Sequence, residues 1–245
     1  MRARARRLLC LILLAGCASG PGRIALPAAD DPAALARAEC ATSVTPGDSS
    51  EAVRVGVEQG ALASLYFVLR GAADRSASAY VAYLKPAAKV PAILSWRWKT
   101  DALVPGADNR DKTREDAPLR VIVAFDGDRA TLPEVEQKRF KRAKNLSGKD
   151  LPYAMLMYIW SDQAEVESVI PSAHTSQIKM LVVASGTRGL GSWQSVRRNV
   201  AEDYRRVYGA EPGPALGVAV MTDTDNTGKK AVGEYADIRF ECEGN

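Results

Sequence analysis

The stretch Leu94-Ser95-Trp96-Arg97-Trp98-Lys99 alternates between apolar and polar side chains. Successive side chains of a β-strand point to opposite faces, so Trp96 and Trp98 share one face while Arg97 and Lys99 share the other. We expect the two indoles to fill the core between two sheets, although indoles beside cations are also the pattern of a glycan-binding surface. The stretch predicts a strand of a β-sandwich, with Arg97 and Lys99 as candidate ligand-binding residues.

Similar runs lie on both sides of this stretch, separated by segments rich in turn residues. Many short strands with turns between them are typical of a sandwich or barrel. The predicted strands are 53–57, 62–69, 78–84, 92–99, 119–125, 153–160, 178–184, 217–221 and 235–242. The sequence therefore predicts a mostly β protein, an antiparallel, jelly-roll-like β-sandwich with two short helices.

Two segments predict the helices. Residues 133–144 have the charge content of a surface helix. Asn199 suits a helix N-cap, Glu202 three residues later completes a capping box, and Gly209 marks the end. We expect the second helix to run from just after Asn199 to just before Gly209.

Length and charge limit the class of protein. The chain has 245 residues, of which 47% are hydrophobic and 25% charged, so it forms one globular domain or at most two. Four of its 33 Lys and Arg residues precede Cys17 and no acid does, which leaves 29 cations against 29 acids in the remainder. This neutral balance predicts no nucleic-acid partner.

The N-terminus predicts export. A basic segment, 1–7, precedes an apolar segment, 8–14, that is too short to span a bilayer. The following Leu14-Ala15-Gly16-Cys17 resembles the lipobox of bacterial lipoproteins, in which the cysteine carries the lipid. The resemblance implies a signal peptide at 1–16 and a lipid on Cys17. The segment 17–39, rich in Ala, Pro and Gly, predicts a flexible tether, and 40–245 predicts one domain. The residue directly after Cys17 is not Asp, so the resemblance also implies a lipid anchor in the outer membrane, with the domain facing the periplasm. The alternative is a plain secretory signal.

Four cysteines remain to be assigned. Cys10 leaves with the signal peptide and Cys17 takes the lipid, so Cys40 and Cys242 are the pair left in an oxidising compartment. We expect them to form a disulfide that ties the first segment of the domain to its last strand. A metal site is disfavoured because the chain has no C-x-x-C, and its one histidine, His174, has no partner at ligand spacing.

An acidic stretch follows the predicted strand 217–221. Asp223, Asp225 and Glu234 stand at positions one, three and twelve of a calcium-loop pattern with Gly228 at six, which makes them candidate metal ligands and calcium the candidate cofactor. Thr227 departs from the pattern at position five, and strands replace the flanking helices. The alternatives are a wide hairpin built from turn residues and an arginine, Arg97 or Arg120, as the partner of the acids. We favour the arginine.

A second set of charged residues lies at the start of the predicted strand 119–125. Glu115 and Asp116 precede it and Arg120 lies at its start. Asp116 and Arg120 would form either a ligand clamp or a salt bridge that holds the strand in place.

Several blocks in order resemble the bacterial family called domain of unknown function 3047. They are 76–78, 95–99, 115–116 with 119–120, 152–160, Trp193 with 198–200 and 203–204, and 222–227. The resemblance implies an exported one-domain protein without an established activity, and Glu115 stands where a second aspartate is expected. The closing stretch 234–240 is also similar to the last strand of jelly-roll carbohydrate-binding modules.

Three functions fit these residues. The favoured one is a non-catalytic binding module for a glycan or cell-envelope polymer, with Arg97, Lys99, Asp116, Arg120, Asp223 and Asp225 as ligand-binding residues. The second is a glycosidase-like hydrolase in which Asp223 or Asp225 works with Asp116 or Glu115. The third is an envelope assembly or scaffolding lipoprotein. Binding is favoured because it does not require the tuned pKa values that catalysis requires, and a Ser-His-Asp site is disfavoured because no G-x-S-x-G elbow is present. Carboxyl groups roughly 5 to 10 Å apart across a cleft would favour the hydrolase, whereas pairing with arginines would favour binding or structure.

Overall fold

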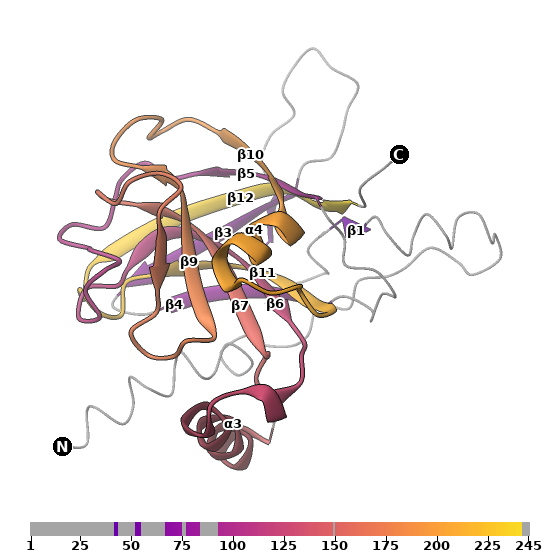
Figure 1. Cartoon of the computed structure of the whole chain (residues 1–245). Helices are drawn as coiled ribbons and strands as arrows, with labels where there is room; N and C mark the ends of the chain where they lie inside the picture. Colours follow the sequence, from indigo (N-terminus) through magenta and orange to yellow (C-terminus); the bar gives the residue numbers. More distant parts are fainter. Residues whose placement is uncertain are drawn as a thin grey trace, which may run out of the picture.

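The strands form two sheets that pack face to face (Figure 1). The computed structural model describes residues 42–43, 52–54, 67–74, 77–83, 93–148 and 150–241. Sheet A has the order β10 (Gln194–Asn199), β5 (Ile93–Lys99), β12 (Lys230–Glu241), β3 (Phe67–Asp74) and β2 (Ala52–Arg54), and β1 (Thr42–Ser43) also pairs with β12. Sheet B has the order β4 (Ala77–Tyr83), β11 (Ala215–Asp223), β6 (Ala117–Phe125), β7 (Ala154–Ser161), β9 (Ile178–Ser185) and β8 (Val169–Pro171). The predicted mostly β sandwich is confirmed.

One pair of strands departs from the expected antiparallel arrangement. β7 and β9 run parallel, with Met155 opposite Ile178 and Tyr158 opposite Leu181. After β7 the chain turns back through β8, which is antiparallel to β9 and forms the edge of the sheet. A second turn inserts β9 between β8 and β7, so β9 takes the direction of β7. Sheet B is therefore mixed.

The core between the sheets is aromatic. Trp96 and Trp98 are fully buried and their rings meet edge to face at 5.4 Å. From sheet B, the ring of Tyr158 lies 5.2 Å from that of Trp96, and the ring of Trp160 lies 6.2 Å from that of Trp98. The expectation that both indoles of the opening stretch fill the core is confirmed, which leaves Arg97 and Lys99 on the outer face of sheet A.

Sheet B is apolar on its outer face as well. Every residue of β7 is buried, and its alternate side chains join a second cluster outside the sandwich core. The cluster comprises Ile122, Met155, Met157, Ile159, Ala164, Ile170, Ile178, Met180, Val182, Ala219 and Met221. This explains why β7 is a continuous apolar run rather than an alternating one. Arg120 lies on the same face, opposite Met221 of β11 and Ile159 of β7.

Both predicted helices are present. α4 (Val200–Tyr208) begins after Asn199, whose Oδ1 accepts a hydrogen bond from the backbone N–H of Glu202 at 3.2 Å, and ends at Gly209 with φ +70°. α4 closes one end of the core, where the Tyr204 ring lies 4.7 Å from that of Phe125. α3 (Glu134–Ser147) extends three residues beyond the expected end and lies below sheet B in Figure 1. A short 3-10 helix, η1 (Arg129–Thr131), precedes it.

Three strands, β1, β8 and β10, were not predicted, and β3 begins later than the expected 62–69. Among the described residues, no helix has both the length and the apolar character needed to cross a bilayer. The signal peptide, the tether, Cys17, Cys40 and Cys242 lie outside the described residues, so these assignments stay predictions.

Candidate functional site

The structure divides the six predicted ligand-binding residues between two places. Arg97 and Lys99 lie on the outer face of sheet A. Asp116, Arg120, Asp223 and Asp225 come together where β6 begins and β11 ends, because the two strands are antiparallel and Asp223 opposes Ala117. We call Asp116, Asp223 and Asp225 the acidic cluster.

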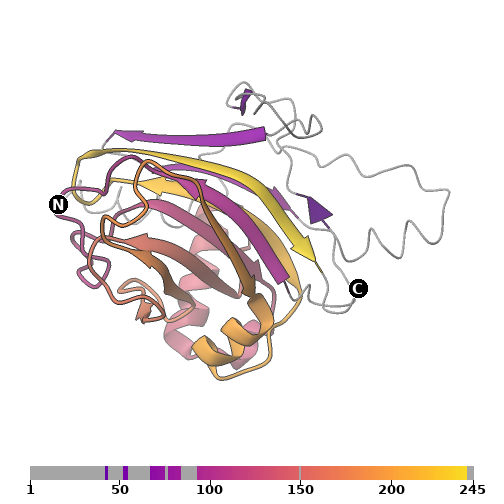
Figure 2. The ribbon, with the colours of Figure 1, turned by 90° about the horizontal axis from the view of Figure 1, so that it is seen from above.

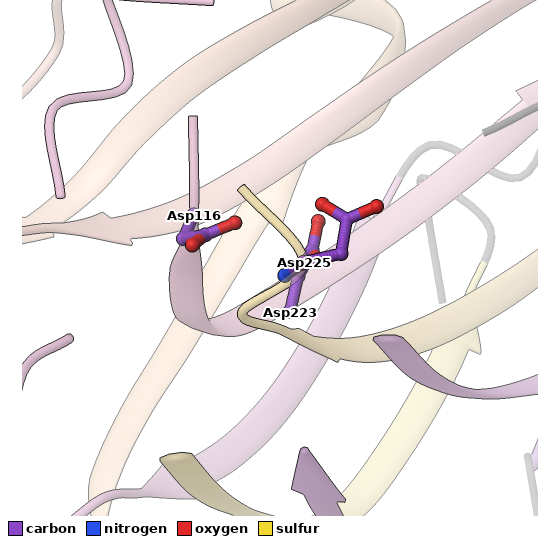
Figure 3. A group of neighbouring side chains, drawn as sticks. All are labelled: Asp116, Asp223 and Asp225. Atoms are coloured by element: carbon purple, nitrogen blue, oxygen red, sulfur yellow. The ribbon is translucent and has the colours of Figure 1, made fainter. Parts of the chain in front are cut away.

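The carboxylates of the acidic cluster lie close together (Figure 3). One oxygen from each of the three lies within 4.8 Å of the others. The side chains of Asp116 and Asp223 are about 1% exposed, whereas Asp225 is partly exposed. Glu234, which the calcium-loop pattern included, lies apart from the cluster: its carboxylate pairs with Lys99 Nζ at 3.2 Å on sheet A. The third carboxylate beside Asp223 and Asp225 is therefore that of Asp116 and not that of Glu234.

Asp116 holds the loop that follows β11. Its Oδ2 accepts a hydrogen bond from the Thr227 backbone N–H at 2.7 Å, and its Oδ1 accepts from the backbone and side-chain nitrogens of Asn226, each at 3.2 Å. Gly228 closes the loop with φ +66°, a left-handed conformation that favours glycine. The Asp, Asn and Gly residues of this stretch therefore stabilise a turn.

Arg120 is the cation beside the cluster. Its guanidinium is about 2% exposed; Nη2 lies 3.3 Å from Asp223 Oδ2 and also donates to the backbone carbonyl of Glu115. Nη1 lies 4.0 Å from the Glu115 carboxylate. The expected pairing of an arginine with the acidic stretch is present, but the partner is Asp223 and not Asp116, whose oxygens are taken by backbone and amide donors.

A bulge in sheet B lets a side chain of sheet A bind backbone groups beside this cluster. The β11–β6 register shifts between Met221 and Asp223. The Tyr235 hydroxyl, from β12, donates to the Met221 carbonyl at 2.6 Å and accepts from the Arg120 backbone N–H at 3.2 Å. One hydroxyl therefore binds backbone groups that the irregular ladder leaves available, and it ties the two sheets together beside Arg120.

Burial sets the charge state of the cluster. It raises the pKa of Asp223 to about 7, with Arg120 opposing the shift and Asp225 and Asp116 adding to it. Burial also raises the pKa of Glu115, against the opposing effect of Arg120. Asp223 is consequently partly protonated at neutral pH, and the repulsion within the cluster is reduced.

This geometry can hold a cation but does not match a glycosidase. Asp116, Asp223 and Asp225 supply the oxygen ligands that calcium or magnesium prefers, while Arg120 already places a positive charge against Asp223. Carboxyl groups of glycosidases lie about 5 to 9.5 Å apart across an open site. Here two of the three side chains are buried, and Asp116 is committed to backbone donors.

The outer face of sheet A presents a different arrangement. Arg97 Nε donates to Asp237 Oδ2 at 2.6 Å, and the Arg97 guanidinium lies 5.3 Å from the centroid of the Trp193 ring. Asp237 has φ +51° and sits in a bulge where two residues of β12 oppose one of β5. Bulges redirect side chains, and this one brings a carboxylate to Arg97.

Further polar groups share this face. Ser195 and Arg197 of β10, both exposed, stand directly opposite Arg97 and Ser95 of β5. The Lys99–Glu234 ion pair continues the face toward β12. Trp193 is partly exposed, whereas the other three tryptophans of the chain are fully buried. We call Arg97, Lys99, Trp193, Glu234 and Asp237 the outer-face site.

Sequence reasoning missed Trp193 and Asp237 as site residues. Trp193 directly precedes β10, a polar edge strand without an alternating pattern that could have revealed it. Asp237 falls at an outward position only because of the bulge in β12.

These features define a mixed β-sandwich with a polar, tryptophan-bearing outer face and a buried acidic cluster. Residues 47–239 match the family described as a protein of unknown function (DUF3047), and the chain belongs to this family. The match includes the outer-face site and the acidic cluster. No curated protein that was compared with the chain matches it.

Proposed function

We propose that this protein is a lipid-anchored, non-catalytic binding module that holds a glycan or related cell-envelope polymer on the outer-face site. The observation that carries the proposal is the half-buried Trp193 beside the Arg97–Asp237 pair on a polar strand face. An indole packs well on the apolar face of a sugar ring, while arginine donors and carboxylate acceptors bind hydroxyl groups.

The site is held in place before any ligand arrives. Arg97 contacts Asp237 on one side and Trp193 on another, and Lys99 pairs with Glu234. Side chains that are already ordered lose less conformational entropy on binding, which favours affinity. Rows of groups across β10, β5 and β12 suit an extended polymer better than a small enclosed ligand.

The acidic cluster has a structural role in this proposal. It fixes the loop after β11 and the start of β6, and two of its three carboxylates are buried, whereas a glycosidase pair lines an open site. The lipobox-like segment supplies the location: an anchor at Cys17 in the outer membrane, with the domain in the periplasm.

Co-sedimentation with purified peptidoglycan sacculi and with insoluble envelope polysaccharide tests the proposal. We expect the protein to sediment with one of these polymers, and Trp193→Ala and Arg97→Ala each to weaken binding about tenfold or more. Arg110→Ala, which removes an exposed arginine paired with Asp108 elsewhere on the surface, is the matched control and should bind normally.

Two results would contradict the proposal. Binding that survives both Trp193→Ala and Arg97→Ala would place the ligand elsewhere. Release of soluble sugar from the polymer, lost in Asp116→Asn, would favour the hydrolase instead. Unchanged melting temperatures of the variants would show that they fold.

A further inference from the structure

Helix α3 attaches to the rest of the molecule along one side. Glu136, Phe140 and Ala143 are buried and recur at helical spacing. The Glu136 carboxylate accepts a hydrogen bond from Thr175 Oγ1 at 2.9 Å, which fixes the helix to the loop before β9. The guanidinium of Arg129 lies 5.7 Å from the centroid of the Phe140 ring.

The opposite side of α3 is exposed and cationic. Lys138, Lys141 and Arg142 lie there, and Val135 and Leu146 lie on one flank of the helix, near its two ends, at 64% and 62% exposure. We call these five residues the outer face of α3. The 14-residue helix contains five Lys and Arg residues and two Glu, although the chain after residue 16 has no net charge. The positive charge is therefore concentrated locally.

Three of the five cations of α3 have acidic partners, Lys138 with Glu134, Arg139 with Glu136 and Lys144 with Asp150. Lys138 pairs with Glu134 at 2.6 Å, but both side chains are more than 70% exposed, and such pairs contribute little free energy. Within the part of the chain that the structure describes, Lys141 and Arg142 form no ion pair. Two cations and two large apolar side chains are thus presented to the surroundings.

The helix α3 and the outer-face site lie on different sides of the molecule. In Figure 1, α3 lies below sheet B while β10, β5 and β12 of sheet A lie at the top. In Figure 2, seen from above, the helix is behind the sandwich. A surface that contacts α3 would leave the outer-face site on the far side of the molecule.

We propose that the outer face of α3 docks on an anionic phospholipid surface, the membrane that holds the lipid anchor. Cations close to such a surface are attracted to it, and apolar side chains at the same level enter the interfacial region. The anchor is part of the proposed function, and this inference rests on it for the choice of membrane. Because the proposed anchor holds the chain at this membrane, docking is intramolecular and favoured at high effective concentration. Docking then orients the outer-face site toward the periplasm.

Lysine acetylation rates in the purified, lipidated protein reconstituted into vesicles test the docking. We compare vesicles of phosphatidylcholine alone with vesicles containing about 30% phosphatidylglycerol. We expect Lys138 and Lys141 to react about threefold or more slowly on the anionic vesicles, and about 0.5 M NaCl to abolish the difference. Lys112 and Lys229, exposed residues outside α3, serve as internal references.

Two charge-reversal variants make the test specific. Lys141→Glu with Arg142→Glu should remove the slower reaction of Lys138. Lys112→Glu with Arg188→Glu changes the net charge equally at exposed positions outside α3 and should leave it intact. Protection that is absent, that is equal on both kinds of vesicle, or that survives Lys141→Glu with Arg142→Glu would overturn the proposal.

The readout separates docking from anchoring. A protein that floats with the vesicles but shows no protection of α3 refutes docking and keeps the anchor. A protein that does not float refutes the anchor, and docking is then measured by the same acetylation rates with anionic vesicles added in excess.

Discussion

At the scale of single residues, Arg120 is a buried charge that needs an acidic partner. Its guanidinium is buried against Asp223, beside Glu115 and two methionine sulfur atoms. Removing one partner of a buried ion pair leaves the other charge without compensation, which costs more than the pair itself contributes. The stability of this end of the sandwich therefore depends on a matched pair and not on either residue alone.

We expect Arg120→Ala to lower the free energy of unfolding by about 3 to 5 kcal/mol, measured by urea denaturation at neutral pH. Adding Asp223→Asn to Arg120→Ala should recover part of the loss, because a neutral amide then replaces a carboxyl group that must either stay charged or take up a proton in the core. Equal stability of the single and the double variant would show that the two residues are not coupled.

The raised pKa of Asp223 predicts a pH dependence. This carboxyl titrates near 7 in the folded protein and near 3.8 when unfolded, so the native state binds the proton more tightly. Its stabilising contribution is present below about pH 4 and is lost as the pH rises through 7. We expect Asp223→Asn to flatten the fall in unfolding free energy between pH 5 and 7.5, as measured by urea denaturation at several pH values.

A control variant isolates that effect. Asp150→Asn removes an exposed carboxylate whose pKa is lowered by Lys144, and it should leave the slope in this pH range unchanged. The interpretation of Asp223 fails if the wild type and Asp223→Asn have the same slope.

Calcium provides a third test at this scale. Because Arg120 already compensates Asp223, we expect millimolar calcium, added to chelated protein, to leave the melting temperature unchanged. A calcium-dependent rise of several degrees, reduced in Asp225→Asn, would instead make Asp116, Asp223 and Asp225 a cation site.

At the scale of elements, the sequence predicts what local pattern encodes and misses what pairing decides. The strands with alternating or continuous apolar runs, β5, β6, β7, β9 and β11, were found, and so was α4 from its caps. β10 is a polar edge strand, and its sequence carries no such pattern. The parallel β7–β9 pair and the bulge at Asp237 depend on which strands become neighbours, which no local window contains.

The candidate site was predicted to a similar extent. The association of Asp116, Arg120, Asp223 and Asp225 follows from their places at strand ends, and the sequence indicated it. The separation of Arg97 and Lys99 from that group could not be predicted, because it depends on the two sheets facing opposite ways. Glu234 shows the limit of motif spacing: as part of β12 it points outward to Lys99 and not toward Asp223.

The pairing of β1 with β12 supports one prediction about the cysteines. Thr42 opposes Phe240 and Ser43 opposes Arg239. In the sequence Cys40 precedes β1 by two residues and Cys242 directly follows β12, and both lie outside the described residues.

We therefore expect peptide mapping without reductant to recover Cys40 and Cys242 in one linked pair. Because the bridge would close a loop of nearly the whole domain, reduction should lower the unfolding free energy by roughly 5 kcal/mol on the chain-entropy model. Two free thiols in protein isolated from the periplasm would refute the bridge.

At the scale of the whole molecule, the two sheets have different roles. Sheet B is apolar on both faces and supports the acidic cluster, the loop before β9 and α3. Sheet A has one face in the core and one polar face that carries Trp193, Arg97 and Asp237. This asymmetry favours a module with one side toward the membrane and the other toward an envelope polymer.

Iodide quenching of tryptophan fluorescence tests the central claim most directly. Trp96, Trp98 and Trp160 are buried, so the quenchable emission of the folded protein comes from Trp193. We expect soluble fragments of the bound envelope polymer to protect this emission in a saturable titration, with the protection absent in Trp193→Phe and weakened about tenfold in Arg97→Ala. Quenching of Trp193 that stays unchanged while the polymer is bound would contradict the account and place the ligand away from sheet A.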